Sequence, residues 1–232
     1  APSAAALEAT LNGPALRFDG PATVALTGAE TRAPRGVCVF VERGDVLEVG
    51  RCLRGVRVYV CVRGGIDVEP TLGSRSTDLL TGLGPAPLRA GDVLAIGPEP
   101  ERPSNPQSVP SPGLPDEPVL RISLGPRDDW FTSSAVEALC SQPWQATPSS
   151  NRVGVRLAGP SLERARADEL LSEGLVTGAL QVPPSGQPIL LLQDHPTTGG
   201  YPVIGVVRSD DLWLAGQLAP SQRVHFALES AI

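Results

Sequence analysis

The sequence predicts a mainly β protein, built as an all-β barrel or sandwich with few helices. Its 25 glycines and 25 prolines interrupt the 232-residue chain every few residues, and long helical periodicity is scarce. Between these breaks lie short runs rich in β-branched and other apolar residues, which favour strands because such side chains pack well on a pleated surface. No apolar run approaches the roughly 20 residues that cross a bilayer as a helix.

The predicted strands follow one another along the chain, and each is bounded by turn residues. In order they are 23–27, 37–42, 46–49, 56–62, 93–96, 119–124, 154–157, 181–182, 189–193, 203–208 and 224–228.

Two short helices are expected among these strands. The segment 132–139 has a hydroxyl side chain, Thr132 or Ser133, that can cap a helix, and its apolar residues share one face. A second helix is expected near 209–218, with Ser209 as its cap and leucines facing inward.

A Pro-rich stretch divides the chain. Residues 98–118 are dominated by Pro, Ser, Glu and Asn and lack any period, so we expect an exposed connector there. Each flank carries enough strands to close its own core. The sequence therefore predicts two tandem β modules, an N-terminal one over 1–97 and a C-terminal one over 119–232.

Composition excludes several function classes. The net charge is −6 and the isoelectric point is about 5.0, so there is no basic surplus to displace counterions from nucleic acid. All 19 basic residues are arginine. A lysine Schiff base, a lysine general base and a P-loop lysine are therefore excluded for this chain. Methionine is also absent, so we expect the N-terminus to be processed or incomplete.

The four cysteines show neither C-x-x-C pairing nor metal-ligand spacing. They are Cys38, Cys52, Cys61 and Cys140. We expect them to be buried small apolar residues in a reducing, cytoplasmic compartment.

The first candidate binding cluster follows the strand predicted over 56–62. That strand ends at Arg63, and the double glycine Gly64-Gly65 permits a turn with positive φ. The later segment 73–78 offers consecutive N–H groups, hydroxyls and an arginine. Together they predict a cradle for a carboxylate or a phosphate.

The same segment has a second interpretation. Ser74, Ser76 and Asp78 can instead cap a short helix while Arg75 pairs with Asp78. The residue pattern leaves both interpretations open.

The second cluster comprises Asn151 and Arg152, which lead into a strand that carries Arg156. The spacing places one arginine in the loop and the other on a strand face. A weak Arg–Glu surface pair is the alternative.

The third cluster surrounds the short strand predicted over 189–193. The side-chain amides of Gln181 and Gln187 can form hydrogen bonds with planar polar groups such as amides and ureas. Asp194 could orient His195, which could act as a general base. Two hydroxyls, two glycines that allow close approach of the backbone and a tyrosine follow. The candidate binding residues here are Gln181, Gln187, Thr197, Thr198, Gly199, Gly200 and Tyr201. The carboxylates in 168–173 lack metal-ligand spacing and predict a solvated turn, so no metal is expected.

Six ordered motifs together resemble one known family. They are Arg-Gly-Gly-Ile-Asp (63–67), Leu-Gly-Ser-Arg-Ser-Thr-Asp (72–78), Asn-Arg-Val-Gly (151–154), Ser-Glu-Gly (172–174), Gly-Ala-Leu-Gln-Val-Pro-Pro-Ser-Gly-Gln-Pro (178–188) and Thr-Thr-Gly-Gly-Tyr-Pro-Val-Ile (197–204). The chain resembles the biotin-dependent carboxyltransferase, or allophanate hydrolase subunit 2, family over about residues 7–226.

The resemblance implies a cyclophilin-like β-barrel architecture and a heteromeric complex. It implies the C component of an ATP-dependent 5-oxoprolinase, which opens the 5-oxoproline lactam to L-glutamate together with a subunit 1 family partner (the B component) and the A component. ATP is then needed by the complex, and the chain alone is expected to be inactive. The alternatives are a carboxyltransferase subunit that uses carboxybiotin on urea or a similar amide, and a non-enzymatic regulator that binds a kinase-inhibitor partner.

Three departures from the family pattern stand out. Members usually carry an N-terminal segment with Thr-Val-Gln-Asp-Leu-Gly-Arg and Ser-Gly-Ala-Met-Asp type motifs, and this chain starts after both. The stretch 28–37 is shorter than the pattern. His195-Pro196 stands where many members have Arg-Gln, which argues against a catalytic role for His195.

Overall fold

The computed structural model describes residues 4–99, 108–109 and 111–229, and the chain divides into two compact units. Unit 1 spans Ala1–Gly113 and unit 2 spans Leu114–Ile232. The predicted connector over 98–118 lies partly outside the described residues, because it includes 100–107 and 110. Each unit has its own buried cluster of apolar side chains. None of the described helices has the length and apolar character needed to span a membrane.

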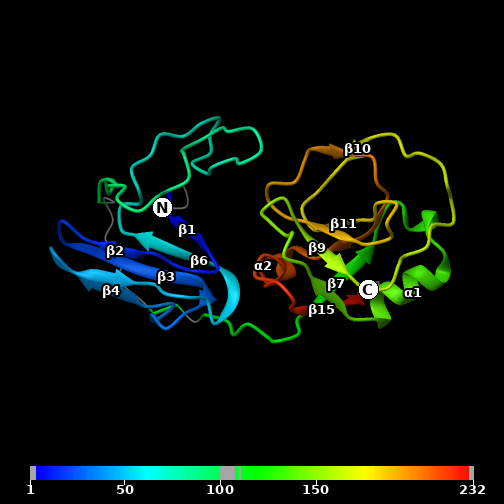
Figure 1. The fold of residues 1–232 in the computed structure, drawn as a ribbon, viewed down its shortest axis with the longest axis horizontal. Helices are drawn as coiled ribbons and strands as arrows, with labels where there is room; N and C mark the ends of the chain where they lie inside the picture. The colour runs from blue at the N-terminus through cyan, green and yellow to red at the C-terminus, as the bar shows by residue number, and fades with distance from the viewer. Residues whose placement is uncertain (1–3, 100–107, 110, 230–232) are drawn as a thin grey trace. The chain divides into compact units, whose positions relative to one another are not determined.

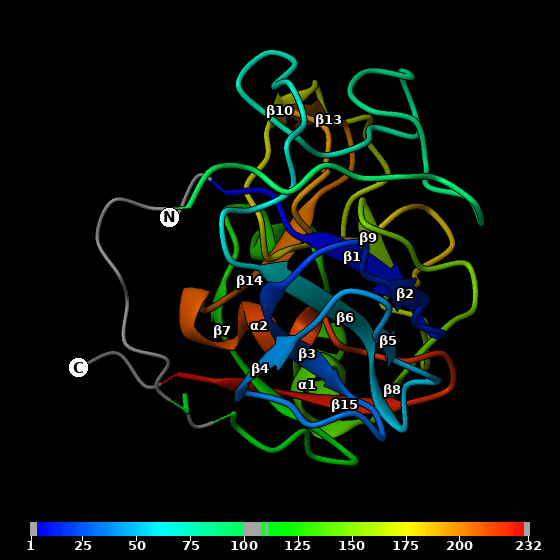
Figure 2. The same ribbon diagram turned by 90° about the vertical axis from the view of Figure 1, so that its left-hand side faces the viewer.

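Unit 1 is built on a four-stranded antiparallel sheet with the order β1-β6-β3-β4 (Figure 2). A separate two-stranded ribbon pairs β2 with β5. The strands are β1 (Leu7–Thr10), β2 (Ala15–Arg17), β3 (Ala22–Glu30), β4 (Cys38–Val41), β5 (Val46–Glu48) and β6 (Arg54–Val62).

Valines fill the core of unit 1 because strand periodicity turns alternate residues inward. Val58, Val60 and Val62 on β6 are buried, and Val60 lies opposite both Leu7 and Leu26. The β-branched run therefore packs between two antiparallel neighbours, as its composition predicts.

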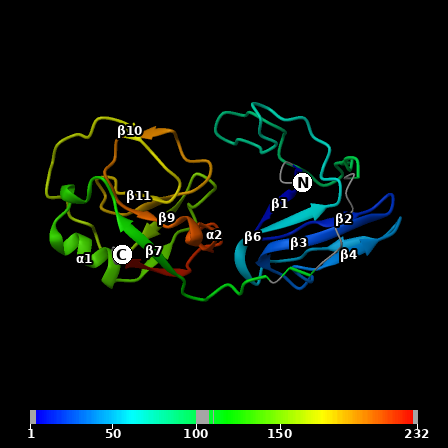
Figure 3. The ribbon, with the colours of Figure 1, turned by 180° about the vertical axis from the view of Figure 1, so that it is seen from behind.

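Unit 2 is a closed seven-stranded barrel with the order β11-β12-β9-β8-β15-β7-β14 (Figures 1 and 3). Within the barrel, β15 runs parallel to β7 and the other pairs are antiparallel. A small ribbon, β10-β13, lies outside it. The strands are β7 (Val119–Leu124), β8 (Trp144–Ala146), β9 (Gly154–Ala158), β10 (Glu173–Gly174), β11 (Ala179–Gln181), β12 (Ile189–Leu191), β13 (Thr198–Gly199), β14 (Val203–Val207) and β15 (Arg223–Leu228).

The helices of unit 2 are short, as predicted. They are η1 (Asp128–Trp130), α1 (Ser133–Ser141), η2 (Ser209–Asp211) and α2 (Leu212–Ala215). Helix α1 packs against β15 and is capped by Thr132, whose hydroxyl accepts a hydrogen bond from the Ala135 N–H. Fully buried Trp144 donates its indole N–H to the carbonyl of Leu139 over 3.0 Å, which joins the helix to the barrel core.

The barrel and the low helix content confirm the mainly β fold class, and some details correct the expectations. The segment 93–96 is not a strand: Ile96 forms one isolated bridge with Ile66, and Val93 is 88% exposed. Leu94 still packs against the core of unit 1, so the segment is anchored by one side chain without pairing as a strand. Ser209 is the first residue of η2 and not a side-chain cap.

The cysteines also differ from the prediction. All four are free thiols, Cys38 is exposed, and Cys52, Cys61 and Cys140 are only half-buried. Cys38 lies on the outer side of β4, at the edge of its sheet, which explains its exposure. Partial burial raises the pKa of the Cys52, Cys61 and Cys140 thiols.

Candidate functional site

The predicted binding residues are divided between the two units. Arg63, Gly64, Gly65, Ser74, Arg75 and Asp78 lie in unit 1, and the others lie on loops and strands of unit 2.

The double glycine after β6 forms the turn that its sequence predicts. Gly64 and Gly65 have φ values of +94° and +76°. A Cβ on Gly64 would lie 2.3 Å from the carbonyl oxygen of Gly97, so only glycine allows this close approach of the backbone. Arg63 Nε lies 3.7 Å from a carboxylate oxygen of Glu99, and it is buried without a hydrogen-bond partner among the described residues.

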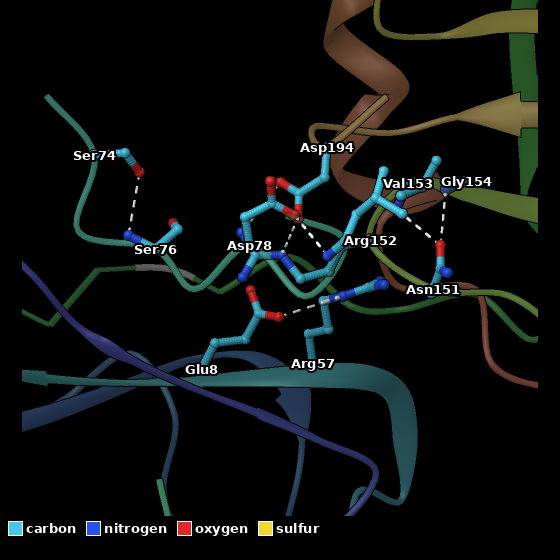
Figure 4. Close-up of polar contacts among 11 residues, drawn as sticks. Glu8, Arg57, Ser74, Ser76, Asp78, Asn151, Arg152, Val153, Gly154 and Asp194 are labelled. Atoms are coloured by element: carbon cyan, nitrogen blue, oxygen red, sulfur yellow. Dashed lines mark hydrogen bonds and ion pairs between the residues drawn. The ribbon is translucent and has the colours of Figure 1, made fainter. Parts of the chain in front are cut away.

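The side chains of 74–78 bind their own loop. The Ser74 hydroxyl accepts a hydrogen bond from the Ser76 N–H at 3.1 Å (Figure 4). The Asp78 carboxylate accepts from the Leu80 N–H at 2.8 Å and from the Thr81 hydroxyl at 2.6 Å. These are turn contacts within one loop, and the short helix that Ser74 and Asp78 were expected to cap does not form in this described segment. Arg75 donates from Nε to the Val68 carbonyl at 2.8 Å, and a ligand role for the segment stays a prediction.

In unit 2, Asn151 and Arg152 form the turn before β9. The Asn151 side-chain oxygen accepts hydrogen bonds from the N–H groups of Val153 and Gly154 at 2.9 and 3.3 Å (Figure 4). This is the local side-chain turn that asparagine favours. Arg152 Nε lies 3.0 Å from Oδ2 of Asp194, and its Nη2 lies 3.3 Å from Oδ1. The pair joins two of the predicted clusters.

Asp194 and His195 are not arranged as orienter and base. Arg152 engages both oxygens of the Asp194 carboxylate. His195 Nδ1 lies 2.8 Å from the carbonyl oxygen of Pro196, which can only accept, so Nδ1 carries the hydrogen. The arginine provides a stronger partner for the carboxylate than the neighbouring imidazole does, so the structure shows an Arg152–Asp194 pair, and the catalytic role of Asp194 and His195 stays a prediction.

The two glutamines act on the backbone in this structure. Gln181 is buried and donates its amide N–H to the Tyr201 carbonyl at 3.2 Å. Gln187 makes two hydrogen bonds to one residue: it accepts from the Gly159 N–H at 2.8 Å and donates to the Gly159 carbonyl at 3.1 Å. Both glutamines therefore position loops, and their amides are engaged before any ligand arrives.

The Thr-Thr-Gly-Gly motif is held in a ribbon. Glu173 and Gly174 pair with Gly199 and Thr198 as β10-β13, so the expected solvated turn is in part a strand. Arg127 holds the Glu173 carboxylate with hydrogen bonds from Nε, at 3.1 Å, and from Nη2. These bonds hold the pKa of Glu173 below its usual value.

An open hollow of about 1120 Å³ lies beside this ribbon. Its wall combines the segment 161–170 with Pro184, Gly200 and Tyr201. The last three residues come from two of the predicted motifs. Arg164 also lines the hollow and was not among the candidate residues predicted from the sequence. The segment that carries it, Glu-Arg-Ala-Arg (163–166), is equally typical of a solvated surface. The described residues contain no group of three His, Cys, Asp or Glu side chains that could hold a metal ion.

Comparison with known proteins agrees with this architecture. Residues 1–228 match the family described as carboxyltransferase domain, subdomain A and B. The chain is 38% identical over 243 residues to the C component of the 5-oxoprolinase of Escherichia coli (strain K12), covering 99% of this chain and 78% of that protein. It is 31% identical over 254 residues to urea amidolyase of Saccharomyces cerevisiae, covering 95% of this chain and 14% of that protein.

A solved structure shows the same fold. The crystal structure of the K. lactis urea amidolyase superimposes with a TM-score of 0.89 at 31% sequence identity, covering 97% of this chain. The chain spans only 16% of the length of that solved chain.

Proposed function

The chain belongs to the carboxyltransferase domain family, subdomain A and B, and on that basis we propose that it is the C component of an ATP-dependent 5-oxoprolinase complex. One observation carries the proposal. The 38% identity to a 5-oxoprolinase C component extends over 99% of this chain and over 78% of that protein. The similarity to urea amidolyases covers only a small part of those longer proteins.

The proposed reaction opens the lactam of 5-oxoproline with water to give L-glutamate. A lactam carbon is a poor electrophile because the nitrogen lone pair is delocalised into the carbonyl group. Transfer of the γ-phosphoryl group from ATP to the carbonyl oxygen, with release of ADP, makes that carbon electrophilic. Water then adds to the carbon, the C–N bond breaks and inorganic phosphate leaves. We assign ATP to the complex and not to this chain, which has no lysine and whose helix α1 has its first turn capped by Thr132. The proposed partners are the A component and a B component of the subunit 1 family.

The part proposed for this chain is to bind and orient the lactam. Thr197, Thr198, Gly200 and Tyr201 are exposed on or beside the β10-β13 ribbon. Their hydroxyls and backbone N–H groups can form hydrogen bonds with a planar amide. Gln181 supports this surface from beneath through the Tyr201 carbonyl.

A second candidate function is carboxyl transfer from carboxybiotin to urea or a similar amide. The TM-score of 0.89 to the K. lactis urea amidolyase favours it, as does the 31% identity to the S. cerevisiae enzyme. Biotin is a cofactor only under this alternative. The surface formed by Thr197, Thr198, Gly200 and Tyr201 would then bind urea, or the similar amide, whose nitrogen accepts the carboxyl group.

Reconstitution separates the two functions. This chain is mixed with the A and B components, and ATP hydrolysis is measured with 5-oxoproline, with urea and with neither. The 5-oxoprolinase proposal expects hydrolysis that depends on 5-oxoproline and on all three proteins. No activity with all three present would reject it. Recovery of a biotinylated protein with the tagged chain, together with urea-dependent hydrolysis, would support the alternative instead.

A further inference from the structure

The hollow of unit 2 is assembled from segments that are fixed by backbone hydrogen bonds. Leu162 N–H donates to the Gly186 carbonyl at 3.0 Å, and Ala165 N–H donates to the Trp130 carbonyl at 2.8 Å. Between them, Arg164 forms an isolated antiparallel bridge with Phe131. A rigid backbone on both sides holds Arg164 in one place on the wall of the hollow.

Arg164 carries a charge that the described part of the chain does not neutralise. Its Nη2 donates to the Val182 carbonyl at 2.6 Å. Its Nε is buried without a hydrogen-bond partner, and no carboxylate among the described residues forms an ion pair with it. Burying part of a cation without a counterion costs free energy.

The other arginines of unit 2 show how unusual this is. Six pair with carboxylates: Arg121 with Asp211, Arg127 with Glu173, Arg152 with Asp194, Arg166 with Asp129, Arg208 with Glu229 and Arg223 with Glu117. Arg156 is exposed to water on β9. Arg164 alone is half-buried in the described part of the unit without such a partner.

The rest of the wall restricts what the ligand can be. Glu163, Asp168 and Glu169 also line the hollow and oppose anions in proportion to their charge, so a polyphosphate is repelled most strongly and a single carboxylate least. Arg166 lines it too, but its charge is already balanced by Asp129 at 2.9 Å. One planar guanidinium matches one carboxylate. Tyr201, whose side chain is partly exposed on the same wall, adds a hydroxyl that can bond a polar ring.

We infer that the hollow beside the β10-β13 ribbon is a binding site for a small monocarboxylate, with Arg164 as the cation that binds the carboxylate. Only the identity of the natural ligand rests on the proposed function, under which it is the carboxylate-bearing lactam 5-oxoproline. The site itself follows from Arg164 and its surroundings.

The test compares two ligands on the full chain without its partners. Titration calorimetry measures 5-oxoproline and 2-pyrrolidinone, which has the same ring without the carboxylate. We expect 5-oxoproline to bind at least about tenfold more tightly, the difference of a single strong charge-assisted contact. Arg164→Gln should abolish this difference, and Arg164→Lys should keep part of it, because lysine keeps the charge but loses the planar fork. The control Arg156→Gln should bind like the wild type.

A second measurement uses only the wild-type chain, so it does not depend on whether the variants fold. In the wild-type chain, 5-oxoproline should shift the backbone amide NMR signals of Gly200 and Tyr201. Equal affinity for the two ligands, no binding of 5-oxoproline, or shifts confined to other segments would overturn the inference. Binding through Arg164 in a chain whose reconstituted complex hydrolyses no ATP would leave the site standing and reject the 5-oxoprolinase proposal alone.

Discussion

The guanidinium of Arg152 holds the carboxylate of Asp194, with Nε 3.0 Å from Oδ2 and Nη2 3.3 Å from Oδ1. This relationship joins the turn before β9 to the loop after β12. It also removes Asp194 from His195, so the histidine lacks the orienting carboxylate that a general base requires.

His195 should prove dispensable for catalysis. In the reconstituted complex, His195→Gln should keep lactam-dependent ATP hydrolysis within about threefold of the wild type and leave its pH profile unchanged, whereas loss of a true general base costs about 10² to 10⁴. Steady-state rates across pH check this. A hundredfold or greater loss of the rate of ATP hydrolysis, together with a shifted pH profile, would show that His195 is a catalytic residue.

Gln187 should prove structural. Gln187→Glu removes the donor to the Gly159 carbonyl and places a negative charge against that oxygen. We expect a loss of about 1 kcal/mol in the free energy of unfolding. Tryptophan fluorescence in a urea titration measures it, because Trp130, Trp144 and Trp213 all lie in unit 2. If the urea midpoint of unfolding is unchanged while ligand binding is weakened, Gln187 is a binding residue and not a structural one.

Acid should weaken unit 2 through Asp211. Its buried carboxylate accepts hydrogen bonds from the Arg121 backbone N–H, Nε and Nη2 at 2.8, 2.9 and 2.7 Å. The hydrogen bonds from the Arg121 side chain are the largest cause that lowers the pKa of Asp211. The ionised Asp211 carboxylate therefore contributes fully to the folding stability of unit 2 above the unfolded-state pKa of an aspartate, about 3.9. This contribution is lost as the pH falls below that value towards the lower folded-state pKa.

Asp211→Asn tests this directly. At neutral pH the variant should be less stable by about 1–3 kcal/mol, because the amide replaces a charged acceptor of three hydrogen bonds. The difference between wild type and variant should shrink as pH falls from about 5 to 2. Urea titrations at several pH values provide the comparison, and a difference that stays constant with pH would contradict the assignment.

Gly159 should tolerate no side chain. A Cβ there would lie 2.6 Å from Cε3 of Trp144, which is fully buried and fixed by its bond to Leu139. Gly159→Ala should cost about 1–3 kcal/mol of stability through overpacking. Gly174→Ala is the matched control, because a Cβ at Gly174 meets nothing within 4 Å. Equal stability of the two variants would show that Trp144 can move aside.

Local sequence signals predicted much of the fold. Strand β7 occupies the predicted 119–124, and α1 starts after the hydroxyl residue expected to cap it. These elements depend on neighbouring residues: branched side chains, a cap and flanking turns. The run 93–96 is also apolar, but it forms only an isolated bridge between Ile96 and Ile66, because a strand needs pairing that continues along a neighbour.

The site was less predictable because its contacts join distant residues. Arg152 and Asp194 are 42 positions apart, and Arg127 and Glu173 are 46 apart. Thr198-Gly199 is too short and too rich in glycine to signal a strand in the sequence, and it forms β13 because β10 lies beside it. Sequence patterns found the loops that carry the motifs. They could not tell which side chains those loops use internally, as with Gln187, or which form no ion pair with another described residue, as with Arg164.

The most direct test of the central claim is the glutamate formed from isotope-labelled 5-oxoproline by this chain with the A and B components and ATP. Our account predicts labelled glutamate in step with phosphate release, and none when this chain is omitted. Labelled glutamate formed equally well without the chain, or no glutamate from the full complex, would contradict it.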